Sequence, residues 1–318
     1  MLATVRLAGL DATEIGLGLA ALGRPGYINL GRDEDLGADR SVRALEHRTH
    51  EVLDAAHAAG VRYFDAARSY GRAEEFLGSW LRSRDIEPGS VTVGSKWGYT
   101  YVADWQIDAD PAEVKDHSVA TFRRQVDETR SLIGPWLSLY QIHSATVETG
   151  VLEDPAVLDA LAELGASGVA VGLTTSGTGQ AETIDRALAV GGFDTVQSTY
   201  NVLERAAGPA LRRAHDAGLG VLIKEALANG RLTAHGDVAP LLRAAERVGA
   251  APDALALAAV LAEPWVDVAL SGAASVDQLE SNLVAAELDF TPDLADALAG
   301  LAEPSDEYWS ERSALSWA

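Results

Sequence analysis

Residues 60–78 read GVRYFDAARSYGRAEEFLG and hold the clearest structural pattern in the chain. Residues 61–64 are rich in β-branched and aromatic side chains, which predicts a short buried strand, and Asp65 follows at its end. The apolar side chains of residues 73–80 have the spacing of a helix. Asp65 and Tyr70 therefore flank one loop that leads from a strand into a helix.

Two later segments end in the same way. Residues 91–98 (VTVGSKWG) carry Lys96 after an alternating apolar run, and residues 137–145 (LSLYQIHSA) carry His143 in the corresponding place. The chain has only three lysines, so a lysine at the end of a buried strand is conspicuous. In a parallel barrel the carboxyl ends of the strands meet at one rim, where catalytic residues gather. If the strands are adjacent, Lys96 and His143 lie close to the loop that carries Asp65 and Tyr70.

This arrangement resembles the aldo-keto reductase superfamily over nearly the whole chain. Residues 65–74 match that family's pattern of a strand ending in Asp followed by Tyr-Gly-x-x-Glu, and the Lys and His strand ends follow in the family's order. The resemblance implies that Tyr70 is the proton donor and that Lys96 with Asp65 adjusts its acidity. It also implies that His143 orients the carbonyl of the substrate.

Each of these residues also has a simpler explanation. Alone, His143 would more often be a core histidine, Tyr70 an aromatic residue at the rim, and Asp65 a helix cap. Their joint order at successive strand ends favours the functional interpretation. Asp and His together could also indicate zinc, but the sequence has no His-x-x-x-His or cysteine pair, so we predict no metal site.

Strand and helix alternate eight times, which predicts a parallel sheet with helical crossovers. A length of 318 residues suits one (β/α)8 TIM barrel with long rim loops, so we predict a single domain over residues 1–318. The competing fold is an open doubly wound sheet. Against it, GLGLAALG at residues 16–23 precedes a loop rather than opening a helix. The predicted barrel strands cover residues 15–19, 61–64, 91–98, 137–145, 169–173, 195–199, 220–223 and 266–270.

Two further segments stand outside the repeats. Residues 3–9 and 13–19, split by Asp11 and Ala12, predict an N-terminal β-hairpin that runs into the first strand. The resemblance implies that this hairpin plugs the bottom of the barrel. Residues 97–116 form a long aromatic connection to a helix that we expect to begin near Pro111.

Connections of that length are usually functional. Trp97 and Tyr99 are therefore predicted to contact the substrate, and the alternative is that the aromatic side chains only pack the loop onto the barrel rim. The end of the chain, with Tyr308, Trp309 and Trp317, is expected to help shape the same pocket.

The resemblance also implies a nicotinamide cofactor across the rim, held by the ends of the later strands. Ser275 suits a helix N-cap as well, a position that favours phosphate in any family. The residues that the resemblance assigns to the cofactor are Thr174, Gln197, Lys224, Leu227, Gly230, Gly272, Ser275, Gln278 and Asn282.

Three departures from the family pattern bear on the cofactor. Thr174 and Thr175 replace the expected Ser-Asn pair, and Lys224 or a neighbour replaces an aromatic residue. Residues 271–282 contain no Arg or Lys, although a 2′-phosphate is normally held by a cation. NADP, the usual cofactor of the family, is the prediction, and NAD stays open.

Composition excludes other classes of partner. The net charge of −22 opposes nucleic acid and anionic membranes, so we expect neither as a partner. No apolar run approaches the roughly 20 residues of a membrane helix. The start of the chain lacks the pattern of a signal peptide and the chain has no cysteine, which together predict a cytoplasmic location.

The predicted function is NAD(P)H-dependent interconversion of a small-molecule carbonyl, as in an aldehyde, ketone or sugar, and an alcohol. Two alternatives belong to other classes. Lys96 at a strand end could be the Schiff-base nucleophile of a lyase. The chain could also be a non-catalytic subunit that binds the cofactor. The sequence determines neither the substrate nor the oligomeric state.

Overall fold

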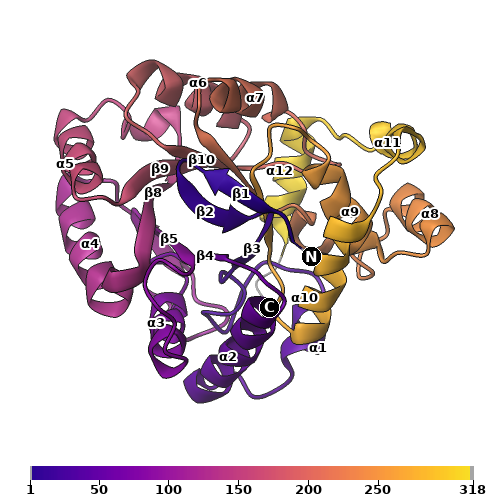
Figure 1. The fold of residues 1–318 in the computed structure, drawn as a ribbon, viewed down its shortest axis with the longest axis horizontal. Helices are drawn as coiled ribbons and strands as arrows, with labels where there is room; N and C mark the ends of the chain where they lie inside the picture. Colours follow the sequence, from indigo (N-terminus) through magenta and orange to yellow (C-terminus); the bar gives the residue numbers. More distant parts are fainter. Residues whose placement is uncertain (1, 316–318) are drawn as a thin grey trace.

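The computed structural model describes residues 2–315, except the side chains of residues 33 and 34. Eight parallel strands form a closed barrel in the order β10-β11-β12-β3-β4-β5-β8-β9, and helices surround it (Figure 1). The predicted TIM barrel is confirmed. Its strands are β3 (Ile15–Gly18), β4 (Tyr63–Asp65), β5 (Thr92–Trp97), β8 (Leu137–Ala145), β9 (Ala170–Thr175), β10 (Thr195–Thr199), β11 (Gly220–Lys224) and β12 (Val268–Ser271).

The barrel strands are buried on both faces, because the interior is filled with side chains and the helices cover the outside. Every residue of β3, β4, β5, β10 and β12 is buried. The helices are α1 (Arg32–Leu36), α2 (Val42–Ala58), α3 (Ala73–Ser83), α4 (Val119–Ile133), α5 (Pro155–Ala166), α6 (Gln180–Val190), α7 (Gly208–Asp216), α8 (Ala239–Val248), α9 (Pro252–Leu261), α10 (Val276–Leu283), α11 (Pro292–Ala299) and α12 (Ser305–Ala314).

The N-terminal hairpin is present, but its turn lies elsewhere than predicted. Strands β1 (Thr4–Leu7) and β2 (Leu10–Thr13) pair in antiparallel register around Ala8 and Gly9. Both turn residues have positive φ, 48° and 87°, as a two-residue turn of this kind requires. The prediction of a turn at Asp11 and Ala12 is therefore wrong, since both residues belong to β2.

The hairpin closes one end of the barrel. It lies across that end in Figure 1, and Leu7, which is fully buried, packs with Leu139, Leu222 and Val268 from three barrel strands. A Cβ on Gly220, the first residue of β11, would lie 2.6 Å from Leu7, so the hairpin sits at the amino ends of the strands. The opposite end is left open for a site.

The long connection after β5 forms a second hairpin, in which β6 (Tyr99–Tyr101) pairs with β7 (Glu113–Lys115). The helix expected near Pro111 instead begins at Val119, where the Ser118 side chain accepts a hydrogen bond from the Thr121 backbone N–H at 3.2 Å. That prediction is wrong because strand pairing, rather than the first turn of a helix, uses the residues after Pro111.

No helix within residues 2–315 is long and apolar enough to cross a membrane.

Candidate active site

A cavity of about 800 Å³ opens at the carboxyl ends of the barrel strands. Asp65 at the end of β4, Gln197 on β10 and Ser271 at the end of β12 line it, together with residues of the loops that follow. Tyr70 and His143 lie on the same wall. The barrel thus places the predicted strand ends around one hollow, where TIM barrels carry their active sites.

Asp65 and Lys96 form a buried ion pair. Their side chains are 2% and 0% exposed, and the Lys96 Nζ donates hydrogen bonds to Asp65 and to the Ala66 carbonyl, the latter at 2.9 Å. Burial lowers the pKa of Lys96, and the charge of Asp65 opposes that effect. The Asp65 carboxylate also accepts hydrogen bonds from the Tyr63 hydroxyl at 3.1 Å and from the Gln197 amide at 3.2 Å. The pair is therefore held in one geometry.

Tyr70 lies beside this pair. The Lys96 Nζ is 4.7 Å from the centroid of the Tyr70 ring, and the His143 ring meets it edge-on at 5.4 Å. Burial raises the pKa of Tyr70 well above its usual value, the Asp65 charge raises it further, and the Arg24 charge acts to lower it. At neutral pH the phenol is consequently protonated and can serve as an acid.

His143 stands between two aromatic rings, with centroids 5.4 Å from Tyr70 and 5.1 Å from Tyr99. Its Nδ1 is 3.4 Å from the Ser69 hydroxyl. Burial, followed by the charges of Lys96 and other cations, lowers the pKa of His143 well below its usual value. The imidazole is therefore neutral and carries a single N–H donor.

The residues predicted for the cofactor divide into two groups. Thr174 and Ser275 do not line the cavity, and their hydroxyls accept local hydrogen bonds, from Ser144 N at 2.7 Å and from Gln278 N at 3.3 Å. Ser275 is the N-cap of α10, as predicted. The other seven line the cavity: Gln197, Lys224, Leu227, Gly230, Gly272, Gln278 and Asn282.

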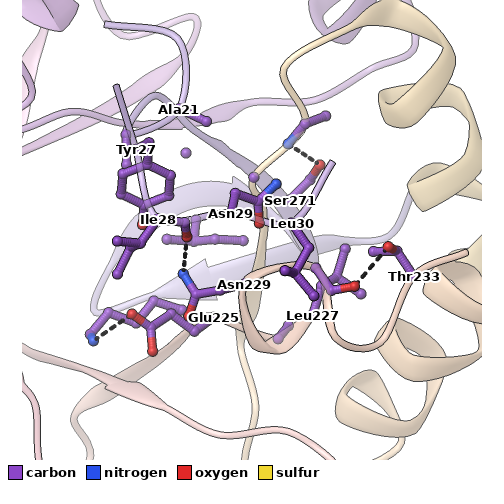
Figure 2. Close-up of a pocket in the computed structure, with 18 of the residues that line it drawn as sticks. Ala21, Tyr27, Ile28, Asn29, Leu30, Glu225, Leu227, Asn229, Thr233 and Ser271 are labelled. Atoms are coloured by element: carbon purple, nitrogen blue, oxygen red, sulfur yellow. Dashed lines mark hydrogen bonds and ion pairs between the residues drawn. The ribbon is translucent and has the colours of Figure 1, made fainter. Parts of the chain in front are cut away.

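Two loops that are far apart in the sequence meet at the wall of the cavity. The Asn229 side-chain amide donates to the Ile28 carbonyl at 2.9 Å, and the Leu30 backbone N–H donates to the Asn229 carbonyl at 3.0 Å. Figure 2 shows the first of these bonds, with Leu227 near it. The loop after β11 is thereby tied to the loop after β3.

Of the two predicted substrate contacts, Tyr99 lines the cavity and Trp97 does not. Trp97 is fully buried, and its ring packs against Phe122 at 5.0 Å and His117 at 5.7 Å. Successive side chains of a strand point to opposite faces, so Lys96, which faces the interior of the barrel, directs its neighbour toward α4.

A model of the aldo/keto reductase family matches residues 14–303. The chain belongs to this family. Among curated aldo-keto reductases, str7 from Strobilurus tenacellus is 26% identical over 329 aligned positions, which cover 92% of this chain and 90% of str7. As a member of the family the chain is an oxidoreductase, and the sequence-based assignment is confirmed.

Solved structures of the family share its fold. The aldo-keto reductase AKR11C1 from Bacillus halodurans superposes with a TM-score of 0.73 at 20% identity, covering 95% of this chain and 97% of that one. The glycerol dehydrogenase AKR11B4 from Gluconobacter oxydans gives 0.72 at 20% identity, with 97% and 95% covered. At such identities the likeness establishes the barrel alone.

Several cavity residues of this aldo/keto reductase were not predicted. Arg24 and Tyr27 lie in a segment whose Gly, Pro and Asp content indicates only a loop, and Glu113 lies in a hairpin that was not expected. Glu225 pairs with Arg312 of α12, 87 residues further along the chain. The adjacent Lys224 was predicted, but no local pattern links Glu225 to the end of the chain.

Some of the residues near the end of the chain that were expected to shape the pocket line the cavity, and others do not. Trp309 and Arg312 line the cavity, whereas Tyr308 is buried and its hydroxyl lies 3.1 Å from the Asn201 side-chain amide. Trp317 lies outside the described residues.

Proposed function

We propose that this oxidoreductase interconverts a small-molecule carbonyl and an alcohol with NAD(P)H, using Tyr70 as the proton donor. The supporting observation is the placement of a protonated phenol in the cavity wall between a buried Lys96–Asp65 pair and a neutral His143. Each of these groups meets one requirement of carbonyl reduction.

The residues present fit a nicotinamide dinucleotide. Gln197 Oε1 is buried without a hydrogen-bond partner among the described residues, and Gln197 lines the cavity beside Asp65, to which its amide donates. An orphaned acceptor of this kind suits the N–H donors of a carboxamide. Space for the rest of the cofactor exists at Gly272, where an added Cβ would meet nothing within 4 Å.

Bound in this cavity, a reduced nicotinamide supplies the hydride that no amino-acid side chain provides. The oxygen of the substrate gains negative charge during reduction, and Tyr70 transfers its proton to that oxygen. Lys96, 4.7 Å from the Tyr70 ring, stabilises the phenolate that remains. His143 donates its N–H to the same oxygen, and a fixed donor in such a place typically contributes a few kcal/mol to transition-state stability.

The two alternatives are less well supported. A Schiff-base lysine must reach the substrate as a free amine, but Lys96 is fully buried and its Nζ is bound by Asp65 and by the Ala66 carbonyl. Membership of an enzyme family disfavours a subunit that only binds the cofactor.

The direct test is turnover. The protein is mixed with NADH or NADPH and a panel of aldehydes, ketones, sugars and simple polyols, and the absorbance of the reduced cofactor is followed. Glyceraldehyde and glycerol belong in the panel because AKR11B4 is a glycerol dehydrogenase. Borohydride trapping runs beside it: a covalent adduct at Lys96 without cofactor turnover would favour the lyase.

The preference between the cofactors depends on the end of the cavity near α10. The Gln278 side-chain amide donates to the Asp35 carboxylate at 2.6 Å, and Asp253 and Asp277 line this end of the cavity. By resemblance, the 2′-phosphate of NADPH would lie here and would meet carboxylates. We therefore propose that NADPH has lost the advantage usual in the family, with affinities for the two cofactors within about a hundredfold of each other.

Gln278→Arg is expected to raise the affinity for NADPH relative to NADH by roughly ten- to a hundredfold, because one charge-assisted hydrogen bond contributes about 1.5–3 kcal/mol. Asp35→Asn combined with it should have a larger effect, since Asp35 would otherwise pair with the new guanidinium. Fluorescence titration measures both affinities, and Gln278→Met is the uncharged control. A wild-type preference for NADPH above about a thousandfold would contradict this assignment of the site.

A further inference from the structure

Arg24 is a buried cation beside Tyr70. Its side chain is 4% exposed, and its guanidinium carbon lies 5.4 Å from the centroid of the Tyr70 ring and 4.9 Å from that of Tyr27. Its Nη1 donates to the Ser69 carbonyl at 3.3 Å and to the Glu113 carboxylate at 3.1 Å. A positive charge therefore faces the proposed proton donor.

The backbone fixes this position. The Arg72 N–H donates to the Gly23 carbonyl at 2.7 Å, so the loop carrying Arg24 is bound to the loop carrying Tyr70. The two backbones are in close contact, because a Cβ on Gly23 would lie 2.2 Å from the Tyr70 carbonyl oxygen and one on Gly71 would lie 2.4 Å from the Gly23 carbonyl oxygen. The approach of Arg24 to Tyr70 thus follows from main-chain packing as well as from the contacts of its own side chain.

We propose that Arg24 is a positioning residue of the carbonyl reduction proposed above, acting as a second cation that stabilises the Tyr70 phenolate, with Glu113 moderating its effect. The inference rests on the proposed function, because it concerns the acidity of Tyr70 during turnover. It differs from the role of Lys96 in one respect: the carboxylate that balances Lys96 is 2% exposed, whereas the one that balances Arg24 is 26% exposed. Solvent therefore screens the charge of Glu113 more than that of Asp65. Glu113 consequently cancels less of the field of Arg24 at Tyr70 than Asp65 cancels of the field of Lys96.

The other charged and titratable groups around Tyr70 come from five strands and one loop. They are Tyr63 and Asp65 on β4, Lys96 on β5, Glu113 on β7, His143 on β8, Lys224 with the adjacent Glu225 at the end of β11, and Tyr27 from the loop of Arg24. Burial and the charge of Asp65 raise the pKa of Tyr70. The charge of Arg24 acts to lower that pKa, and the charges of Glu113 and Glu225 raise it. Arg24 and Glu113 should therefore act on Tyr70 in opposite directions.

Two neutralising substitutions test this opposition. Arg24→Met removes the cation and should raise the pKa of Tyr70, whereas Glu113→Gln removes the moderating carboxylate and should lower it. In the alcohol-oxidation direction Tyr70 must act as a base, so below its pKa the rate falls tenfold for each unit by which that pKa rises. We expect Arg24→Met to reduce kcat for oxidation by roughly ten- to a hundredfold at fixed pH.

Glu113→Gln should increase the same rate or move its pH profile toward lower pH. Arg24→Lys, which keeps a charge but loses the planar fork, should recover part of the rate lost in Arg24→Met. Circular dichroism and fluorescence titration of NADH check that each variant is folded and binds cofactor, so that a structural loss is distinguished from a change in acidity.

A merely structural ion pair predicts a different result, since breaking it from either side would reduce the rate in both variants. If both variants lose oxidation rate, or if the pH profile of Arg24→Met matches that of the wild type, the proposed role of Arg24 is wrong. Turnover by the wild type would still support the proposed function in that case. If the wild type turns over no carbonyl or alcohol with either cofactor, the proposed function fails and this inference fails with it.

Discussion

Tyr70→Phe is expected to lose carbonyl reduction by about 10²- to 10⁴-fold while the fold and the affinity for cofactor are retained, because removal of a general acid typically costs that much. The substitution deletes one hydroxyl and keeps the ring that packs edge-on against His143. The loss should appear in kcat, since the substrate still binds but its oxygen gains no proton. Steady-state kinetics with the best substrate of the panel gives the measurement.

Tyr101→Phe is the matched control. Tyr101 belongs to β6 and does not line the cavity, so its variant loses a phenol hydroxyl without touching the proposed proton donor. Thermal unfolding of both variants separates stability from chemistry. If Tyr70→Phe turns over at the wild-type rate, another group donates the proton and the assignment is wrong.

The barrel was predictable because each βα repeat carries its own signals. The strands predicted at residues 137–145 and 195–199 begin and end where β8 and β10 do. The errors fell where local signals compete. Asp11 has turn propensity but pairs with Arg6 in the β1–β2 ladder, and Pro111 is common at helix starts but here connects two strands.

The site was predictable to the extent that it lies at strand ends. Asp65, Lys96 and His143 end or nearly end their strands, and the parallel pairing of β4 with β5 and of β5 with β8 brings them together. Trp97 shows the limit of that argument. It follows Lys96 in the sequence, but whether its side chain points into the barrel or toward the helices cannot be predicted until the register of the strand is known. Arg24 lies in an irregular connection and Glu113 lies 89 residues further along, in the β6–β7 hairpin, and only tertiary packing joins them.

Lys96→Met tests the centre of the site by leaving Asp65 without its cation. Breaking a buried ion pair from one side typically costs about 3–5 kcal/mol of stability, because the remaining charge stays desolvated. Asp65 keeps its hydrogen bonds from Tyr63 and Gln197, which limit the loss but supply no positive charge. Urea unfolding should therefore show a clear decrease in the free energy of unfolding, and reduction should slow by about a hundredfold or more.

The double variant Asp65→Asn, Lys96→Met distinguishes stability from catalysis. Replacing both members of a buried pair by neutral groups is often close to neutral for stability, so unfolding should return most of the way to the wild type. Activity should not return, because the cation 4.7 Å from the Tyr70 ring is still missing. Because Asp65→Asn also removes the charge that raises the pKa of Tyr70, the rate of carbonyl reduction, and not the pH dependence of alcohol oxidation, is the readout for the missing cation in the double variant. If the double variant recovered both stability and rate, the pair would only support the fold, and the cation that stabilises the Tyr70 phenolate would have to be another one.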